Sequence, residues 1–143
     1  MAYKRNTDRL PIPPKDATVH NVVCHFCIVG CGYKAYSWPV NKQGGPEPAD
    51  NAFGADLTQQ QDPVSDTWYT PSMYNIVKQN GRDVHLVVKP DQDCSVNSGL
   101  ASIRGGRLGE LSYSTTTATQ QQRLTQPLVW RYSGYYPTSW KDA

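Results

Sequence analysis

Large aliphatic and phenylalanine side chains are scarce in this sequence. Leu, Ile, Val and Phe account for 26 of the 143 residues, about 18%. Chains with less than about 20% of these residues and a high net charge are usually disordered. The net charge here is only +2, however, and four Trp and nine Tyr add bulk that a core can bury. We therefore expect a folded, loop-rich chain that draws stability from a cofactor, a partner or further sequence.

Long hydrophobic runs are also absent. The N-terminal stretch MAYKRNTDRLPIPPKDA carries positive charges but no apolar run behind them, so it does not resemble a secretory signal peptide. No stretch approaches the length of a transmembrane segment. The charge of +2 is spread along the chain and gives no reason to expect a nucleic-acid partner.

Two parts of the chain show the pattern of paired strands. Residues 19–38 predict two short strands on either side of a loop, because side chains in the second half alternate between two faces. Residues 74–88 (YNIVKQNGRDVHLVV) predict a hairpin that turns at Asn80 and Gly81, since this dipeptide accepts the positive φ angles of a tight turn.

The remaining segments predict less regular structure. Residues 39–72 are rich in Pro, Gly, Gln, Asn and Asp and indicate a long excursion. Residues 98–113 could hold a short helix, weakened by Gly105 and Gly106. The fold class we expect is α+β, rich in strands and loops, with short antiparallel strands and few helices.

Three cysteines lie close together in the segment CHFCIVGC. Two residues separate Cys24 from Cys27, three separate Cys27 from Cys31, and Cys94 lies far downstream. A disulfide scaffold is the least favoured explanation, because three crowded thiols leave an odd number locally and no export signal is present.

Two kinds of metal site remain possible at this stage. Zinc could be held by the three cysteines with His20 or His25 as the fourth ligand, although zinc knuckles usually contain two paired ligand loops. An iron–sulfur cluster also suits a tight loop of thiolates completed by a ligand from a distant part of the chain. A bacterial ferredoxin is excluded, because its run needs Cys and Pro where this chain has Asn21 and Gly32.

The segment VNSGLASIRGG at 96–106 favours the iron–sulfur cluster. In many enzymes of the dimethyl sulfoxide reductase family, which bind molybdenum through two molybdopterin guanine dinucleotides, a C-x2-C-x3-C loop is completed by a distant Cys-x-Lys/Arg-Gly. Here Ser102 stands where that cysteine belongs, followed by Arg104 and Gly105. With CHFCIVGCGY, LPIPP, CSVNSGL and RLTQPLVWR, this serine makes the sequence resemble the N-terminal portion of arsenite oxidase large subunits.

The resemblance implies a 3Fe-4S cluster bound by Cys24, Cys27 and Cys31. A serine hydroxyl is a hard donor that matches poorly with a sulfur-rich corner, so Ser102 would face a corner that lacks the fourth iron. The resemblance places Arg104 between the cluster and one pterin, where a fixed cation would assist electron transfer. Cys94 is expected to be a small buried hydrophobe and not a ligand.

The histidines receive structural roles at this stage. His20 and His25 are expected in or around the loop without binding metal, because the thiols suffice. His85 is expected inside a strand. The aromatic residues of the tail need be nothing more than packing surface for further domains.

The resemblance also implies an activity and partners. The whole subunit would oxidise arsenite to arsenate at a molybdenum bis-pterin centre. Its electrons would pass through the cluster to a Rieske 2Fe-2S small subunit and then to cytochrome c or azurin. The protein would be periplasmic, exported with the signal of its partner. Residues 1–113 would form the iron–sulfur domain, and residues 114–143 a linker to molybdopterin domains.

Two other functions remain open from the sequence. Another member of the same family, such as a nitrate reductase or a formate dehydrogenase, is disfavoured by Ser102, because those enzymes normally keep the cysteine. A small zinc-binding interaction module is the alternative from a different class. The residues that would contact arsenite are expected outside these 143 residues, and this chain alone is expected to be inactive.

Overall fold

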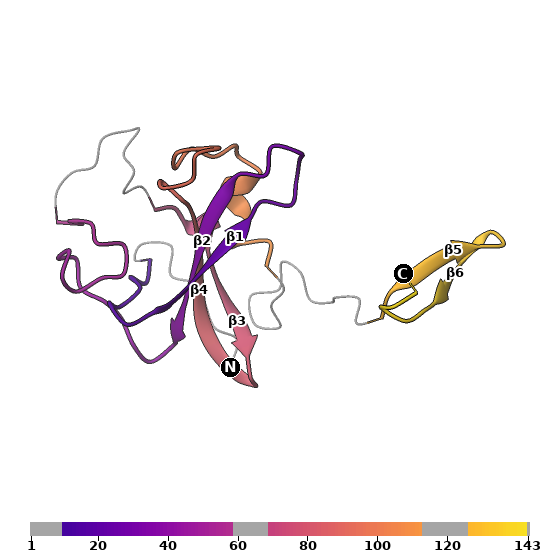
Figure 1. Cartoon of the computed structure of the whole chain (residues 1–143). Helices are drawn as coiled ribbons and strands as arrows, with labels where there is room; N and C mark the ends of the chain where they lie inside the picture. The colour runs from indigo at the N-terminus through magenta and orange to yellow at the C-terminus, as the bar shows by residue number, and fades with distance from the viewer. Residues whose placement is uncertain (1–9, 59–68, 113–125, 143) are drawn as a thin grey trace.

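The computed structural model describes residues 10–58, 69–112 and 126–142, and strands dominate it (Figure 1). Four antiparallel strands form one sheet in the order β1-β2-β4-β3: β1 (Thr18–Val23), β2 (Gly32–Pro39), β3 (Tyr74–Gln79) and β4 (Arg82–Pro90). The short 3-10 helices are η1 (Pro71–Met73) and η2 (Gly105–Arg107), and a second sheet contains β5 (Leu128–Arg131) and β6 (Gly134–Pro137). The described residues contain no α-helix, so the expected excess of strand over helix is confirmed.

Both predicted strand pairs are present in the structure. β1 and β2 are antiparallel with Val23 opposite Gly32, so the cysteine segment is the loop that joins them. β3 and β4 meet at the predicted turn, where Asn80 has a φ of 51° and Gly81 a φ of 78°. Two successive positive φ angles are the geometry that matches the twist of a two-residue hairpin.

The sheet buries side chains on both faces. One core contains Tyr36, Trp38, Met73, Tyr74, Ile76 and Val87. The other contains Cys24, Tyr33, Val88 and Leu108. Because neighbouring residues of a strand point to opposite faces, β2 contributes to both cores. Tyrosine and tryptophan therefore supply much of the buried volume, as their number in the sequence predicts.

The C-terminal part of the chain differs from expectation. Residues 128–137 form the hairpin of β5 and β6, which the sequence analysis did not predict. Its aromatic side chains are exposed. The rings of Trp130 and Tyr135 contact each other edge to face, with 4.9 Å between their centroids. The short helix allowed within residues 98–113 is reduced to the single turn η2, and Gly105 and Gly106 belong to it. None of the helices within the described residues is long and apolar enough to cross a membrane.

His85 lies inside the sheet in a fully paired environment, which supports its structural role. The ring is 4% exposed, its Nε2 lies 3.2 Å from the carbonyl oxygen of Val40, and its Nδ1 lies 2.8 Å from the hydroxyl of Tyr74. A carbonyl can only accept, so Nε2 donates to Val40 and Nδ1 accepts from Tyr74. Burial lowers the pKa of His85 below its ordinary value of 6.5.

This lowered pKa predicts a pH dependence of stability. Below pH 6.5 the unfolded chain binds a proton at His85 that the folded chain does not yet bind, so the free energy of unfolding should fall as the pH drops from 7.5 towards 5.5. His85→Gln should show a flatter profile in urea unfolding. The exposed His20 and His25 are present in both proteins, so they cancel in the comparison. Parallel profiles would contradict the assignment.

Candidate metal centre

The three clustered cysteines occupy the loop between β1 and β2. Cys24 directly follows β1 and Cys31 directly precedes β2, and the backbone N–H of Cys24 donates to the carbonyl of Cys31 at 2.9 Å. Gly30, with a φ of 68°, allows the chain to turn back before Cys31. The pairing of the strands therefore closes the loop and brings its first and last cysteines together.

The three thiols differ in exposure. Cys24 is 8% exposed and Cys31 is partly buried, and both belong to the core that contains Tyr33. Cys27 lies in the exposed middle of the loop. All four cysteines of the chain are free thiols, so the structure gives no support to a disulfide scaffold.

The donor set consists of three free thiols on one loop. Among the residues that the structure describes, no three His, Cys, Asp or Glu side chains gather closely enough to hold one metal ion. The cysteines of an iron–sulfur cluster each bind a different iron, so they lie farther apart than the ligands of one ion. Cys24, Cys27 and Cys31 stay the predicted ligands of a cluster.

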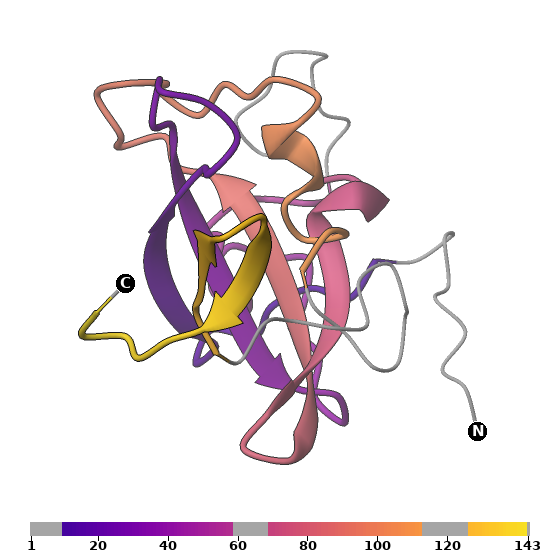
Figure 2. The same cartoon turned by 90° about the vertical axis from the view of Figure 1, so that its right-hand side faces the viewer.

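The segment at residues 96–106, called the distal segment below, lies next to this loop, as the sequence predicts. Ala101 packs against the core that contains Cys24 and Cys31, and Gly105 contacts the hydroxyl end of Tyr33. Figure 2 shows the chain that follows β4 at the same end of the sheet as the β1–β2 loop. Ser102 and Arg104 lie between these two contacts and are exposed. The approach of the Ser102 hydroxyl to the thiols themselves stays a prediction.

Hydrogen bonds tie the loop after β4 to the residue that follows Cys31. The side chain of Asn97 accepts from the N–H of Gly32 at 2.8 Å and donates to its carbonyl at 3.2 Å. The N–H of Asp91 donates to the same carbonyl at 3.0 Å. Asn97 is only 9% exposed, so these bonds are protected from water. The segment leading to Ser102 is thereby anchored at the base of the cysteine loop.

Cys94 lies on the other side of β2 from the clustered cysteines. A Cβ atom on Gly32 would lie 2.7 Å from the Cys94 sulfur, whereas Cys31 and Tyr33 point to the opposite face of the strand. The backbone N–H groups of Val96, Gly32 and Asn97 lower the pKa of the Cys94 thiol. Cys94 is partly exposed, so the expectation of a buried hydrophobe is wrong. Its sulfur lies against Gly32, on the face of β2 opposite to Cys31 and Tyr33.

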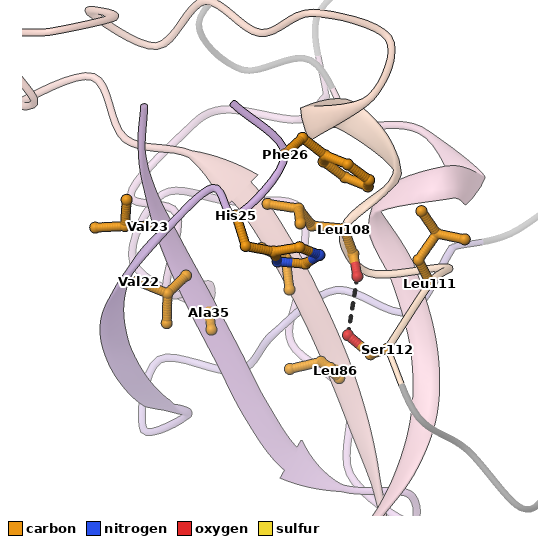
Figure 3. A pocket seen from close by; sticks show the side chains of 10 residues that line it. Val22, Val23, His25, Phe26, Ala35, Leu86, Leu108, Leu111 and Ser112 are labelled. Carbon is orange, nitrogen blue, oxygen red and sulfur yellow. Dashed lines mark hydrogen bonds between the residues drawn. The ribbon is translucent and has the colours of Figure 1, made fainter. Parts of the chain in front are cut away.

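An apolar pocket is lined in part by Val23 and His25, the sequence neighbours of Cys24 (Figure 3). Its volume is about 470 Å³, and most of its lining is aliphatic or aromatic: Val22, Val23, Phe26, Ala35, Leu86, Val88, Leu108 and Leu111. His25 lies at this pocket and stacks on Phe26 with 4.7 Å between the ring centroids. His20 lies on the exposed edge strand β1. Neither histidine joins a cysteine in a metal-ligand group among the described residues.

Tyr33 is a buried residue beside the candidate site to which the sequence analysis assigned no role. It is 1% exposed and follows Cys31 by two positions. Burial, followed by the negative charges of Cys24 and Cys31, raises its pKa to about 12, so both sulfurs lie within electrostatic reach of the phenol. The available signal was its place in the strand alternation, on the face that Cys31 also occupies.

Comparison with known proteins agrees with this geometry. The curated relatives include the iodate reductase subunit IdrA of Denitromonas iodatirespirans, 44% identical over 135 residues, which are 93% of this chain and 15% of that protein. The arsenite oxidase subunit AioA of Herminiimonas arsenicoxydans is 41% identical over 140 residues, 97% of this chain and 17% of that protein. IdrA of Pseudomonas sp. (strain SCT) is 39% identical over 94% of this chain. The chain thus spans only about a sixth of the length of these relatives.

The relatives confirm the resemblance to arsenite oxidase large subunits and widen it. An iodate reductase subunit is as similar to this chain as an arsenite oxidase subunit is. A family model described as "Rieske 3Fe-4S" matches residues 24–119, beginning at the first clustered cysteine and extending past the distal segment. Since this match takes in both the cysteine loop and the segment packed against it, the chain belongs to the Rieske 3Fe-4S family of iron–sulfur domains.

Proposed function

We propose that this chain is the iron–sulfur domain of a molybdenum bis-pterin oxidoreductase and holds a 3Fe-4S cluster on Cys24, Cys27 and Cys31. The observation that carries the proposal is the meeting of two distant segments at Tyr33: the cysteine loop on one side and the Ser102–Gly105 turn on the other. Such a cluster would supply one-electron transfer. The thiolates bind it, and the buried ring of Tyr33 keeps water away from its inner side.

Ser102 and Arg104 complete the proposed site. Both are exposed on the turn that begins η2, which leaves their side chains free to face a cofactor. Ser102 takes the position of the fourth thiolate and leaves one corner without iron. Arg104 would lie between the cluster and a pterin, where its fixed positive charge stabilises the electron-rich cluster and its N–H groups can donate to the pterin.

We further propose arsenite as the substrate of the whole subunit, with electrons leaving through the cluster to a Rieske 2Fe-2S subunit and a periplasmic cytochrome c or azurin. Similarity to AioA supports this assignment. The second candidate is iodate reduction, favoured by the 44% identity to IdrA. In that case electrons would run through the same cluster in the opposite direction, towards molybdenum.

Metal analysis and electron paramagnetic resonance of the full-length subunit test these proposals together. Iron with acid-labile sulfide, molybdenum and a three-iron signal in the oxidised protein are expected, and zinc without iron would support the interaction module instead. Arsenite added without air to the oxidised protein should bleach the three-iron signal. If the substrate is iodate, arsenite should leave the signal unchanged, and iodate should restore it in the reduced protein.

A further inference from the structure

The side chain of Tyr33 fills the space between the two segments of the proposed site. It extends from the second residue of β2 and belongs to the core that contains Cys24 and Leu108. Ala101 packs against the same core from the distal segment. A ring that is 1% exposed and packed on both sides has little freedom to move, because protein interiors are packed as densely as organic crystals.

Gly105 lies directly against the hydroxyl end of this ring. A Cβ atom built on Gly105 would lie 1.9 Å from the Tyr33 hydroxyl oxygen and 2.9 Å from Cζ. Real Cβ atoms do not approach other atoms so closely, so any side chain at position 105 must push the turn or the ring away. Gly105 does not have a positive φ, so space and not backbone conformation requires glycine here.

The position of Gly105 determines the position of Ser102. The N–H of Gly105 donates to the Ser102 hydroxyl at 3.4 Å, and the N–H of Gly106 donates to the Ser102 carbonyl at 2.9 Å. Ser102 therefore belongs to the same turn, and displacing the turn from Tyr33 moves Ser102 with it.

We infer that Tyr33 is a positioning residue, whose ring holds Gly105, and through it the Ser102 turn, against the cysteine loop. The inference rests on the proposed cluster site, because it states that Tyr33 holds Ser102 over that cluster, at the position where a fourth thiolate is missing. It also explains why the residue after Arg104 is glycine in this chain.

A double-mutant cycle in the full-length subunit tests this contact. Gly105→Ala should lower the ratio of folded, cluster-bound protein to unfolded protein in a urea titration roughly five- to a hundredfold. The reason is that overpacking a close contact destabilises the folded state by an amount that corresponds to this change. Tyr33→Phe alone removes only the hydroxyl and should have a small effect. The double variant Tyr33→Phe/Gly105→Ala loses the clash with the hydroxyl oxygen but keeps the 2.9 Å approach to Cζ, so it should recover part of the retention. The three-iron signal and the reduction potential should shift in Gly105→Ala and return towards wild type in the double variant.

Gly109 provides the matched control. A Cβ atom there would lie 1.9 Å from the carbonyl oxygen of Met73, so Gly109→Ala creates a clash that is at least as severe, against the backbone at the end of η1. Tyr33→Phe should not rescue Gly109→Ala, and clusters retained in that variant should keep the wild-type potential. Additive effects of Tyr33→Phe and Gly105→Ala, or equal rescue of both alanine variants, would overturn the inference. A wild-type subunit without any iron–sulfur signal would refute the proposed function instead, and the contact would then be judged from the unfolding midpoints of the same cycle.

Discussion

Replacing Cys27 by serine in the full-length subunit is expected to reduce its iron and acid-labile sulfide to background and to abolish its three-iron signal. The physical reason is the loss of one of three thiolates, since a serine hydroxyl is a poor ligand for such a cluster. Cys27 is the best of the three positions for this test because it is exposed. Surface substitutions usually change stability by about 0.5 kcal/mol or less, so a loss of iron would report on ligation and not on folding.

Cys94→Ser is the control for this experiment. The Cys94 sulfur lies against Gly32 on the opposite face of β2, so its removal should leave iron, sulfide and the three-iron signal unchanged. Full cluster content in Cys27→Ser would contradict the proposed ligand set. Loss of the cluster in Cys94→Ser would instead make Cys94 a ligand or a group required for loading.

The second large effect is expected from Ser102→Cys, which supplies the missing sulfur ligand. If the absent thiolate keeps the cluster at three irons, the variant should bind a fourth iron. The added negative charge favours the oxidised cluster and lowers its reduction potential. Each drop of about 59 mV shifts a one-electron equilibrium about tenfold. Electron exit from molybdenum should therefore slow more than arsenite binding weakens.

Electron paramagnetic resonance measures the first step of this prediction. The oxidised Ser102→Cys variant should lose the three-iron signal, whereas Ser102→Ala, which removes the hydroxyl without adding sulfur, should keep it. A Ser102→Cys protein that retains the signal, with its new thiol shown to be reduced and unmodified, would mean that residue 102 does not face the open corner.

The main sheet could be predicted from the sequence because its signals are local. The strand alternation around Tyr33 and the Asn80-Gly81 turn each depend on a few neighbouring residues, and both reappear in the structure. The hairpin of β5 and β6 was missed because its turn contains Tyr132 and Ser133, with φ angles of 49° and 64°. Tyrosine and serine rarely adopt such angles, and the turn lacks the Asn-Gly or Asp-Gly pair that marks a two-residue hairpin.

The site was predictable as a set of residue types but not as a packing arrangement. The spacing of Cys24, Cys27 and Cys31 and the frame around Ser102 identify the loop and its distant partner. The contact of Tyr33 with Gly105 depends on the register between strands and on a turn 72 residues away, which no local pattern encodes. The substrate could not be predicted from this sequence either, because relatives named for arsenite and for iodate match it equally well.

The connectivity of the sheet suggests an order of events during synthesis. β1 and β2 are neighbours in sequence, so the loop that carries the three cysteines can close as soon as Pro39 has emerged. Pairing of β2 with β4 must wait for residues 84–90, and such distant contacts form more slowly because a longer loop must be closed. The nascent hairpin would therefore offer three thiolates to a cluster donor before residues 101–105 exist. The segment that carries Ser102 would then pack against a cysteine loop that has already formed.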